Sequence, residues 1–154
     1  LSPATIESGC MKFVPGSHKL SIQPHKDTFA KDNLLSRGQE VAVEVDEAKV
    51  VHDELRPGQM SLHHVKLVHG SEANRSDDRR LGFVIRYIPT YVRQVVGKID
   101  SAMLVRGRDE FGNFEPEQGP KADLDQAAVA FYQATLERMN SVLYRNTEKA
   151  PTGM

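Results

Sequence analysis

The stretch SLHHVKLVHGSEANRSDDRRLGF holds three of the chain's six histidines, His63, His64 and His69, within seven residues. Neutral imidazole is the commonest metal ligand in proteins, and a strand would hold its ring in a fixed direction. An arginine pair, Arg79 and Arg80, follows a run of turn-forming residues. An arginine on the strand beside a metal-binding histidine is suited to binding a carboxylate through two parallel hydrogen bonds. The types and spacing of these residues therefore fit a metal site next to an anion site.

Each of these features also has an ordinary explanation. A single histidine on a strand is more often a core or surface residue than a ligand, and a charge cluster in a hairpin loop is usually solvated. On a regular strand His63 and His69 would share one face, so His69 has at most one histidine neighbour on its own side. On the next strand Arg80 and Arg86 would share a face, with Gly82 between them leaving room for a ligand. Spacing alone predicts a β-rich domain that is compatible with metal binding.

The composition is that of a soluble globular protein and excludes some classes of partner. The chain has 154 residues, 39% hydrophobic and 27% charged, and a formal net charge of −1. This length predicts one domain with a core of ordinary size. With no basic patch and no long apolar run, we expect no nucleic-acid or membrane partner. The single Cys10 excludes an internal disulfide, is expected to be a small buried hydrophobic residue, and fits a cytoplasmic location.

The order of hydrophobic residues predicts strands first and a helix at the end. Four segments within about fifty residues alternate or are rich in β-branched residues, which indicates an antiparallel sheet. They are residues 41–45, 49–55, 60–69 and 79–88, the last being the clearest. Residues 106–121 predict a loop, and residues 123–146 predict a helix with Asp123 as N-cap. The apolar stripe of that helix comprises Ala128, Tyr132, Leu136, Met139 and Leu143, and we expect it to pack on the sheet or on a second subunit.

Two segments resemble the phytanoyl-CoA dioxygenase family. They are SGCMKFVPGSHK, residues 8–19, and LRPGQMSLHHVKLVHGSEANRSDDRRLGFVIRYIP, residues 55–89, and the resemblance covers about residues 5 to 91. It implies a mainly β fold, a double-stranded β-helix (jelly-roll) that is incomplete at its N-terminus, with a C-terminal α-helix. Residues 1–91 would be the C-terminal part of the oxygenase domain. Residues 92–154 would be an extension packed on that domain or on a partner subunit.

The same resemblance implies a cosubstrate site for ferrous iron, Fe(2+), and 2-oxoglutarate. His69 corresponds to the distal metal ligand, Arg80 to the arginine that binds the far carboxylate of 2-oxoglutarate, and Ser71 to a hydroxyl contact to that carboxylate. Arg79 is the competing candidate for the arginine. No residue is assigned to the chemical step itself.

The family's other two metal ligands form a His-x-Asp pair that precedes the G-C-M segment, and this chain has no such pair there. HKD, residues 25–27, has the right letters at the wrong place, and we expect a loop histidine beside a turn or capping Asp27. The chain has no initiator Met and opens like the end of a strand, so we expect it to be the later part of a longer polypeptide. By itself it should bind iron weakly.

The implied activity is a dioxygenase that hydroxylates an aliphatic C–H bond of a small molecule, using dioxygen and converting 2-oxoglutarate to succinate and CO2. His18, His63, His64 and Arg86 are candidates to line the pocket. Two alternatives remain open. One is a non-haem iron halogenase of the same fold, because the residue that decides between these chemistries is not in this sequence. The other is a non-catalytic, truncated β-domain that covers its open edge by forming a homodimer.

Overall fold

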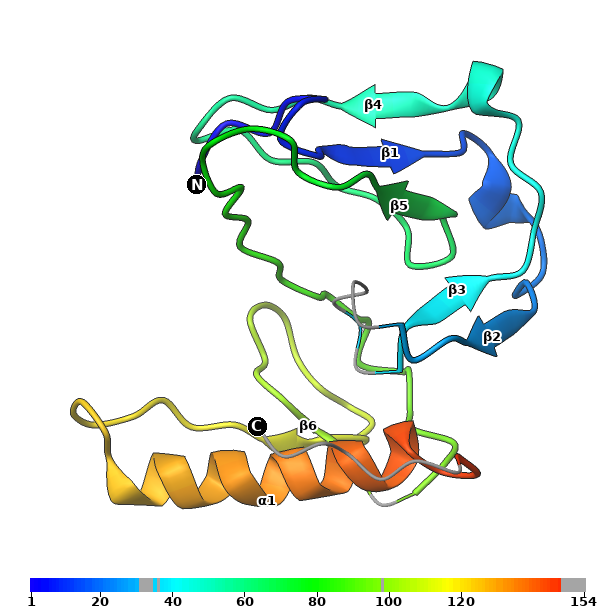
Figure 1. The fold of residues 1–154 in the computed structure, drawn as a ribbon. Helices are drawn as coiled ribbons and strands as arrows, with labels where there is room; N and C mark the ends of the chain where they lie inside the picture. The colour runs from blue at the N-terminus through cyan, green and yellow to red at the C-terminus, as the bar shows by residue number, and fades with distance from the viewer. Residues whose placement is uncertain (31–34, 36, 98, 148–154) are drawn as a thin grey trace. The chain divides into compact units, whose positions relative to one another are not determined.

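The computed structural model describes residues 1–30, 35, 37–97 and 99–147, and within this part the protein is mainly β with one α-helix near its C-terminus (Figure 1). Contacts divide the chain into two compact units, Leu1–Ile85 and Arg86–Met154. The elements are β1 (Met11–Phe13), the 3₁₀ turn η1 (Ser17–Lys19), β2 (His25–Asp27), β3 (Gln39–Val41), the 3₁₀ turn η2 (Glu47–Lys49), β4 (Val51–Asp53), β5 (His69–Ser71), β6 (Ser101–Ala102), β7 (Glu115–Pro116) and α1 (Gln126–Leu143). The expected boundary near residue 91 stays a prediction.

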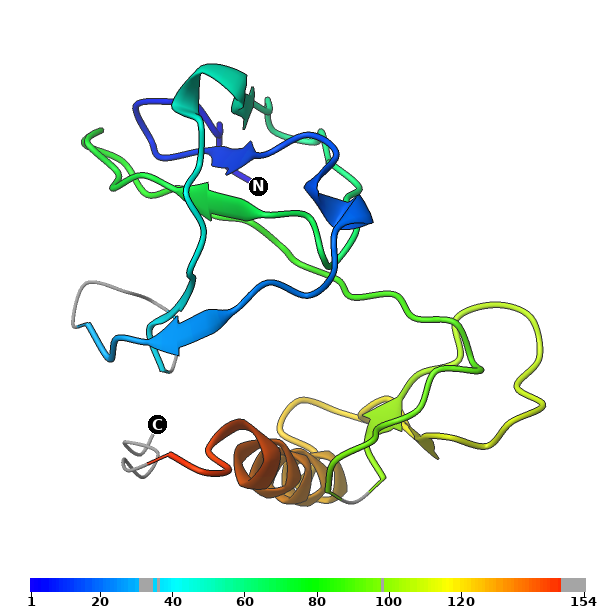
Figure 2. The same ribbon diagram turned by 90° about the vertical axis from the view of Figure 1, so that its right-hand side faces the viewer.

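The first unit is built around a three-stranded antiparallel sheet in the order β4-β1-β5, with β1 in the centre (Figure 1). Phe13 of β1 lies opposite Val51 of β4 and His69 of β5. A separate antiparallel pair, β2 with β3, lies in the same unit (Figure 1), and Figure 2 shows the same ribbon turned by 90°. These strands are only three residues long, so the hydrogen bonds between them contribute little stability. Side chains and turns must therefore help to stabilise the sheet.

The turn before β1 depends on glycine. Gly9 has φ +71°, and a Cβ at this position would collide with the backbone oxygen of Glu72. Ser8 closes the turn from inside: its hydroxyl accepts a hydrogen bond from the Thr5 backbone N–H at 2.9 Å. The turn therefore holds the residue after β5 close to the start of β1, which fixes the two strands side by side.

Little of the described chain is buried, and the prediction of a core of ordinary size is wrong. Cys10, 3% exposed, is the one buried hydrophobic residue among those described, which confirms that it is a small buried hydrophobic residue. Large apolar side chains such as Leu62, Val65 and Phe83 are exposed by 79% or more of their surface. A hydrophobic side chain is stabilised by the apolar area that it removes from water, and here much of that area stays in water.

Three of the four strand predictions need correction. The segment 41–45 contributes only Val41, because β3 ends there, while 49–55 does contain β4. Of 60–69 only His69 lies in a strand, since the Leu67 amide bonds back to the His64 carbonyl in a turn. The face assignment for His63 and His64 therefore does not apply.

The segment 79–88 forms no strand within the described structure, although its pattern was the clearest. A strand exists through hydrogen bonds to a neighbour, and the backbone of residues 82–88 makes none with any described residue. Figure 1 draws this stretch as a bare trace without an arrow. The hydrophobic pattern predicts the extended conformation that these residues prefer, but it does not determine whether a neighbouring strand is available for hydrogen bonding.

The second unit combines a short parallel pair, β6 with β7, and the helix α1. The predicted helix is confirmed, but it starts two residues later, with Asp125 as the N-cap that accepts a hydrogen bond from the Ala127 N–H. Tyr132 and Met139 of the predicted stripe are more than half exposed. The helix instead contacts Gly97 through Val142, and Arg138 pairs with Glu115. No helix in the described part of the chain combines the length and apolarity needed to cross a membrane.

Candidate functional site

The sheet face that carries His69 also carries Ser71. Both belong to β5, two residues apart, so their side chains project from the same side. Ser71 lies opposite Met11, and His69 lies opposite Phe13. Both are exposed, so an imidazole and a hydroxyl are offered together at one surface. The sequence prediction that these two residues serve one site is compatible with this placement.

His69 is oriented by a hydrogen bond that settles its tautomer. Its Nδ1 lies 2.7 Å from the Leu67 carbonyl oxygen. A carbonyl only accepts hydrogen bonds, so Nδ1 must carry the proton, and in the neutral ring Nε2 keeps its lone pair. This is the usual arrangement of a metal-binding histidine, whose second nitrogen is held by a carbonyl or a carboxylate.

The aromatic rings of Phe13, His63 and His69 lie close together. The centroid of Phe13 lies 4.7 Å from that of His63 and 6.2 Å from that of His69. The two histidine rings are 5.8 Å apart. Tilted ring contacts of this length restrict the orientation of each ring. The structure therefore brings the pocket candidate His63 next to the metal-ligand candidate His69.

The other two histidine candidates form a second pair. The rings of His18 and His64 are 5.9 Å apart, and His64 Nδ1 accepts a hydrogen bond from the Lys66 N–H at 3.1 Å. That Nδ1 is therefore unprotonated, the opposite tautomer to His69.

Ser17, a residue that sequence reasoning missed, locks the segment before β5. The residue is 7% exposed, and its hydroxyl donates to the Val14 carbonyl at 2.7 Å and accepts from the Val68 N–H at 2.8 Å. Val14 N–H also donates to the Val68 carbonyl. A small hydroxyl residue directly after Gly16 was the signal that could have identified it, since serine there bonds to nearby backbone.

Arg80 is half-buried and makes no hydrogen bond or ion pair with another residue in the described part of the chain. Its charge acts on Cys10: burial raises the pKa of that thiol, Glu54 and Asp53 raise it further, and Arg80 lowers it. Arg80 therefore lies near the start of β1. The structure shows no direct bond from Arg80 to His69 or Ser71. Arg79 is exposed, and its backbone N–H donates a hydrogen bond to the Asp78 carboxylate.

The fit of a metal ion can be judged from the donor atoms. Residues 1–30, 35, 37–97 and 99–147 contain no group of three or more His, Cys, Asp or Glu side chains placed to hold one. His25 and Asp27 do not compensate. His25 Nδ1 bonds to the Gln23 carbonyl, and Asp27 accepts from Arg37 Nε at 3.0 Å. They lie on β2, so the loop expected for them is wrong. The described residues therefore do not by themselves form a three-ligand site.

The opposite side of the sheet is held by charge. Lys12 Nζ lies 2.6 Å from Glu72 and 3.0 Å from Glu47. Hydrogen bonds to Glu72 and then Glu47 raise the pKa of Lys12, and the hydrogen bond from Lys12 lowers the pKa of Glu72. This bridge joins the residue after β5 to η2.

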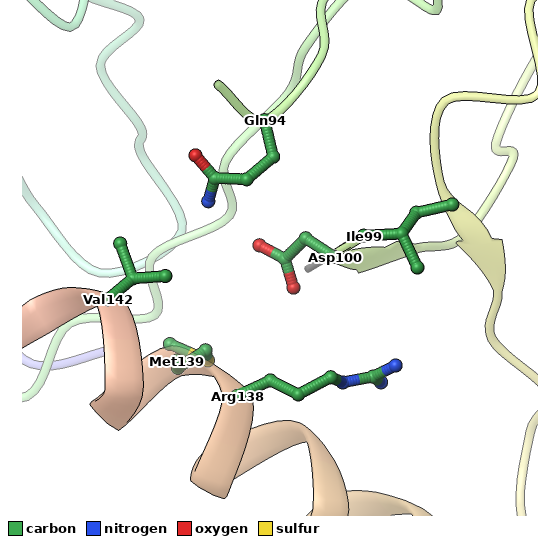
Figure 3. Close-up of a pocket in the computed structure, with 6 residues that line it drawn as sticks. All are labelled: Gln94, Ile99, Asp100, Arg138, Met139 and Val142. Carbon is green, nitrogen blue, oxygen red and sulfur yellow. The ribbon is translucent and has the colours of Figure 1, made fainter. Parts of the chain in front are cut away.

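A small cavity in the second unit contains none of the predicted site residues. It is lined by Gln94, Ile99, Asp100, Arg138, Met139 and Val142 (Figure 3). Its volume of about 10 Å³ accommodates one water molecule and no substrate. Arg138 Nε is buried without a partner among the described residues.

The backbone of this chain matches about half of a solved non-heme monooxygenase. The structure of ThoJ in its apo form, a non-heme monooxygenase, is 38% identical with a TM-score of 0.79 and matches 94% of this chain and 50% of ThoJ. The ThoJ-Ni complex matches with 33% identity and a TM-score of 0.71, covering 94% of this chain and 49% of that one.

The family follows from the sequence. The phytanoyl-CoA dioxygenase (PhyH) family model matches residues 1–82, so the chain belongs to this family, as its motifs indicated. A phytanoyl-CoA dioxygenase domain-containing protein 1 homolog of Caenorhabditis briggsae is 31% identical over 96 residues, which are 55% of this chain and 31% of that protein. A probable phytanoyl-CoA dioxygenase of Caenorhabditis elegans is 29% identical over 83 residues, 54% of this chain and 27% of that protein. The chain thus spans about a third of the length of these relatives and half that of ThoJ.

Proposed function

We propose that this chain supplies part of the active site of an Fe(2+)- and 2-oxoglutarate-dependent oxygenase with a jelly-roll fold. The enzyme would hydroxylate an aliphatic C–H bond of a small-molecule substrate with dioxygen, and 2-oxoglutarate would become succinate and CO2. The observation that carries the proposal is His69, whose Nδ1 is held by the Leu67 carbonyl while Nε2 keeps its lone pair at an exposed sheet face. Membership of the PhyH family supports it.

Each residue then has a defined task. His69 would give one nitrogen ligand to the metal, which supplies the redox chemistry when bound. Ser71 would donate its hydroxyl to a carboxylate oxygen of 2-oxoglutarate, and Arg80 would pair with that carboxylate, because its guanidinium is not engaged by another described residue. His63 would line the pocket through its contact with His69. The remaining metal ligands would come from polypeptide outside this sequence.

The test compares this chain with a chimera that joins it to the half of ThoJ that it does not match. Succinate formation from 2-oxoglutarate is measured with Fe(2+) for both proteins. We expect none above background from the chain alone and turnover from the chimera. A chimera with His69→Ala should be inactive, whereas His25→Ala should retain turnover, because the one hydrogen bond of the His25 ring to a described residue goes to the Gln23 carbonyl. A chimera that is folded and inactive with His69 intact would contradict the proposal.

A non-catalytic β-domain is the second candidate, and one observation favours it: the described residues contain no three-ligand metal group. Such a domain would bind a partner through its sheet and would need no iron. The chimera separates the two candidates, since a purely structural domain would leave it without turnover.

A further inference from the structure

Basic side chains from two loops of the first unit meet at one surface. His18 lies in η1, and His64 lies in the turn that precedes β5. Their rings are 5.9 Å apart, and the Lys66 ammonium reaches the first loop, where it donates to the Leu20 carbonyl at 2.9 Å. The buried Ser17 hydroxyl holds the same two loops together. These basic residues are far apart in the sequence, so the sequence contains no basic run that would indicate the cluster.

The side chains of this cluster have hydrogen-bond donors to spare. His64 Nδ1 accepts from the Lys66 backbone N–H, so Nε2 carries the proton of the neutral ring and is a donor. The Lys66 ammonium has three protons, and the Leu20 carbonyl takes one of them. The His18 ring makes no hydrogen bond with another described residue. His64 and Lys66 together therefore offer about three N–H donors, and His18 adds to them.

The charge of this cluster is not neutralised by any described residue, in contrast to a second His-Lys sequence in the same unit. Lys66 and the exposed Lys19 form no ion pair with another described residue. In the second sequence, Lys26 pairs with Glu40 at 3.3 Å. The Nδ1 of His25 lies 2.7 Å from a backbone carbonyl oxygen, so in the neutral ring its Nε2 has no proton to donate. Positive charge without a partner attracts an anion, and only the first cluster has both the charge and the donors.

We propose that His18, His64 and Lys66 form a binding site for a phosphate group. Lysine binds phosphate as a point charge, and imidazole N–H groups donate to its oxygens. A phosphate group offers more acceptor oxygens than a carboxylate, which suits a cluster with several donors from two loops. Inorganic phosphate and a phosphate ester of a small molecule present the same chemistry. The site needs neither iron nor 2-oxoglutarate, so it goes beyond the proposed function.

The test is a titration of the full chain with inorganic phosphate at constant ionic strength, followed through the backbone amide signals in heteronuclear NMR spectra. We expect saturable shifts of the Lys66 and Leu20 amides and no shift of the Lys26 amide. Acetate, as the carboxylate probe, should bind more weakly than phosphate. Methyl phosphate distinguishes the two sources, because tighter binding than that of inorganic phosphate indicates an ester and weaker binding indicates the free ion. Succinate is not measured, so the result does not depend on the proposed chemistry.

Substitutions assign the shifts to the proposed side chains. His64→Phe keeps a ring beside His18 but removes the donor, and Lys66→Met removes the charge. Each should raise the half-saturating phosphate concentration about tenfold. Lys26→Met is the matched control and should change it less than about twofold. Lys19→Met alters only an exposed side chain, so it tests the site even if a variant in the turn unfolds, and it should raise this concentration about threefold.

Four results would overturn the proposal. They are the absence of saturable shifts, binding of acetate as tight as that of phosphate, unchanged phosphate affinity in the folded variants of the cluster, and an equal loss of affinity in Lys26→Met.

Discussion

β5 and the stretch from 82 to 88 show opposite relations between composition and structure. β5 is His-Gly-Ser, a sequence with poor strand propensity, and yet it forms a full ladder with β1. Residues 82–88 contain phenylalanine, valine, two isoleucines and tyrosine, and they form no ladder with any described residue. β5 is held beside β1 by the turn at Gly9, by the Ser17 hydroxyl and by the ion pair of Lys12 with Glu72. Strand formation in this protein therefore depends first on an available neighbouring strand and only second on the strand propensity of the residues.

The largest effect is expected where a turn brings β1 to β5. Gly9→Ala should lower the free energy of unfolding by about 3 kcal/mol, because it adds a Cβ against the Glu72 carbonyl to a residue at φ +71°. Gly16→Ala is the matched control: φ is +81°, but nothing lies within 4 Å of the added Cβ. It should cost about 1 kcal/mol. Urea unfolding measures both, and equal losses would show that the close approach is unimportant.

Next in size is the effect expected at Arg80, the residue proposed to bind the carboxylate of 2-oxoglutarate. In the ThoJ chimera, Arg80→Ala should weaken 2-oxoglutarate binding about thirtyfold, equal to about 2 kcal/mol, because a charge-assisted pair is lost. Arg79→Ala should change it less than about twofold, since that side chain is exposed. Isothermal titration calorimetry with a redox-inert divalent metal measures both. The reverse ranking would move the assignment to Arg79.

Ser17 provides a smaller test of how β5 is held. Ser17→Ala removes the donor to the Val14 carbonyl and the acceptor for the Val68 N–H, both partly buried. We expect a loss of about 1.5 kcal/mol and faster exchange of the Val68 amide. The exposed Ser21, whose hydroxyl makes no hydrogen bond with a described residue, is the control, and Ser21→Ala should be neutral. If both variants unfold alike, Ser17 does not lock this segment.

The smallest effect concerns the charge bridge of Lys12. Lys12→Met should cost about 0.5 kcal/mol near neutral pH, since both carboxylates are largely exposed. The pKa of Glu72 lies below its ordinary value of 4.5, so its contribution is present above pH 4.5 and lost as the pH falls through the lowered pKa. The raised pKa of Lys12 gives stability that is complete below its ordinary 10.5 and is lost above the raised value.

The difference between wild type and Lys12→Met should therefore be widest between these limits. Chemical unfolding across the pH range, with Lys49→Met as a control on the nearby exposed pair with Asp46, measures it. A difference that persists unchanged in acid would exclude the carboxylates as its source.

The sequence by itself determined the family, the C-terminal helix and the buried Cys10, whereas the structure showed that His69 and Ser71 share one strand. The first three follow from short motifs and local periodicity, which act through neighbours in the chain. The tertiary structure alone decided that Asp27 pairs with Arg37, that the rings of His63 and His69 lie together beside Phe13, and that the Ser17 hydroxyl accepts from the Val68 N–H. It also decided that residues 79–88, which have the clearest strand pattern in the sequence, form no strand within the described structure. The hydrogen bond from Val68 to Ser17 and the contact of both histidine rings with Phe13 depend on segments far apart in the sequence meeting in space. Alternation of side chains encodes which face is apolar without encoding what lies against it.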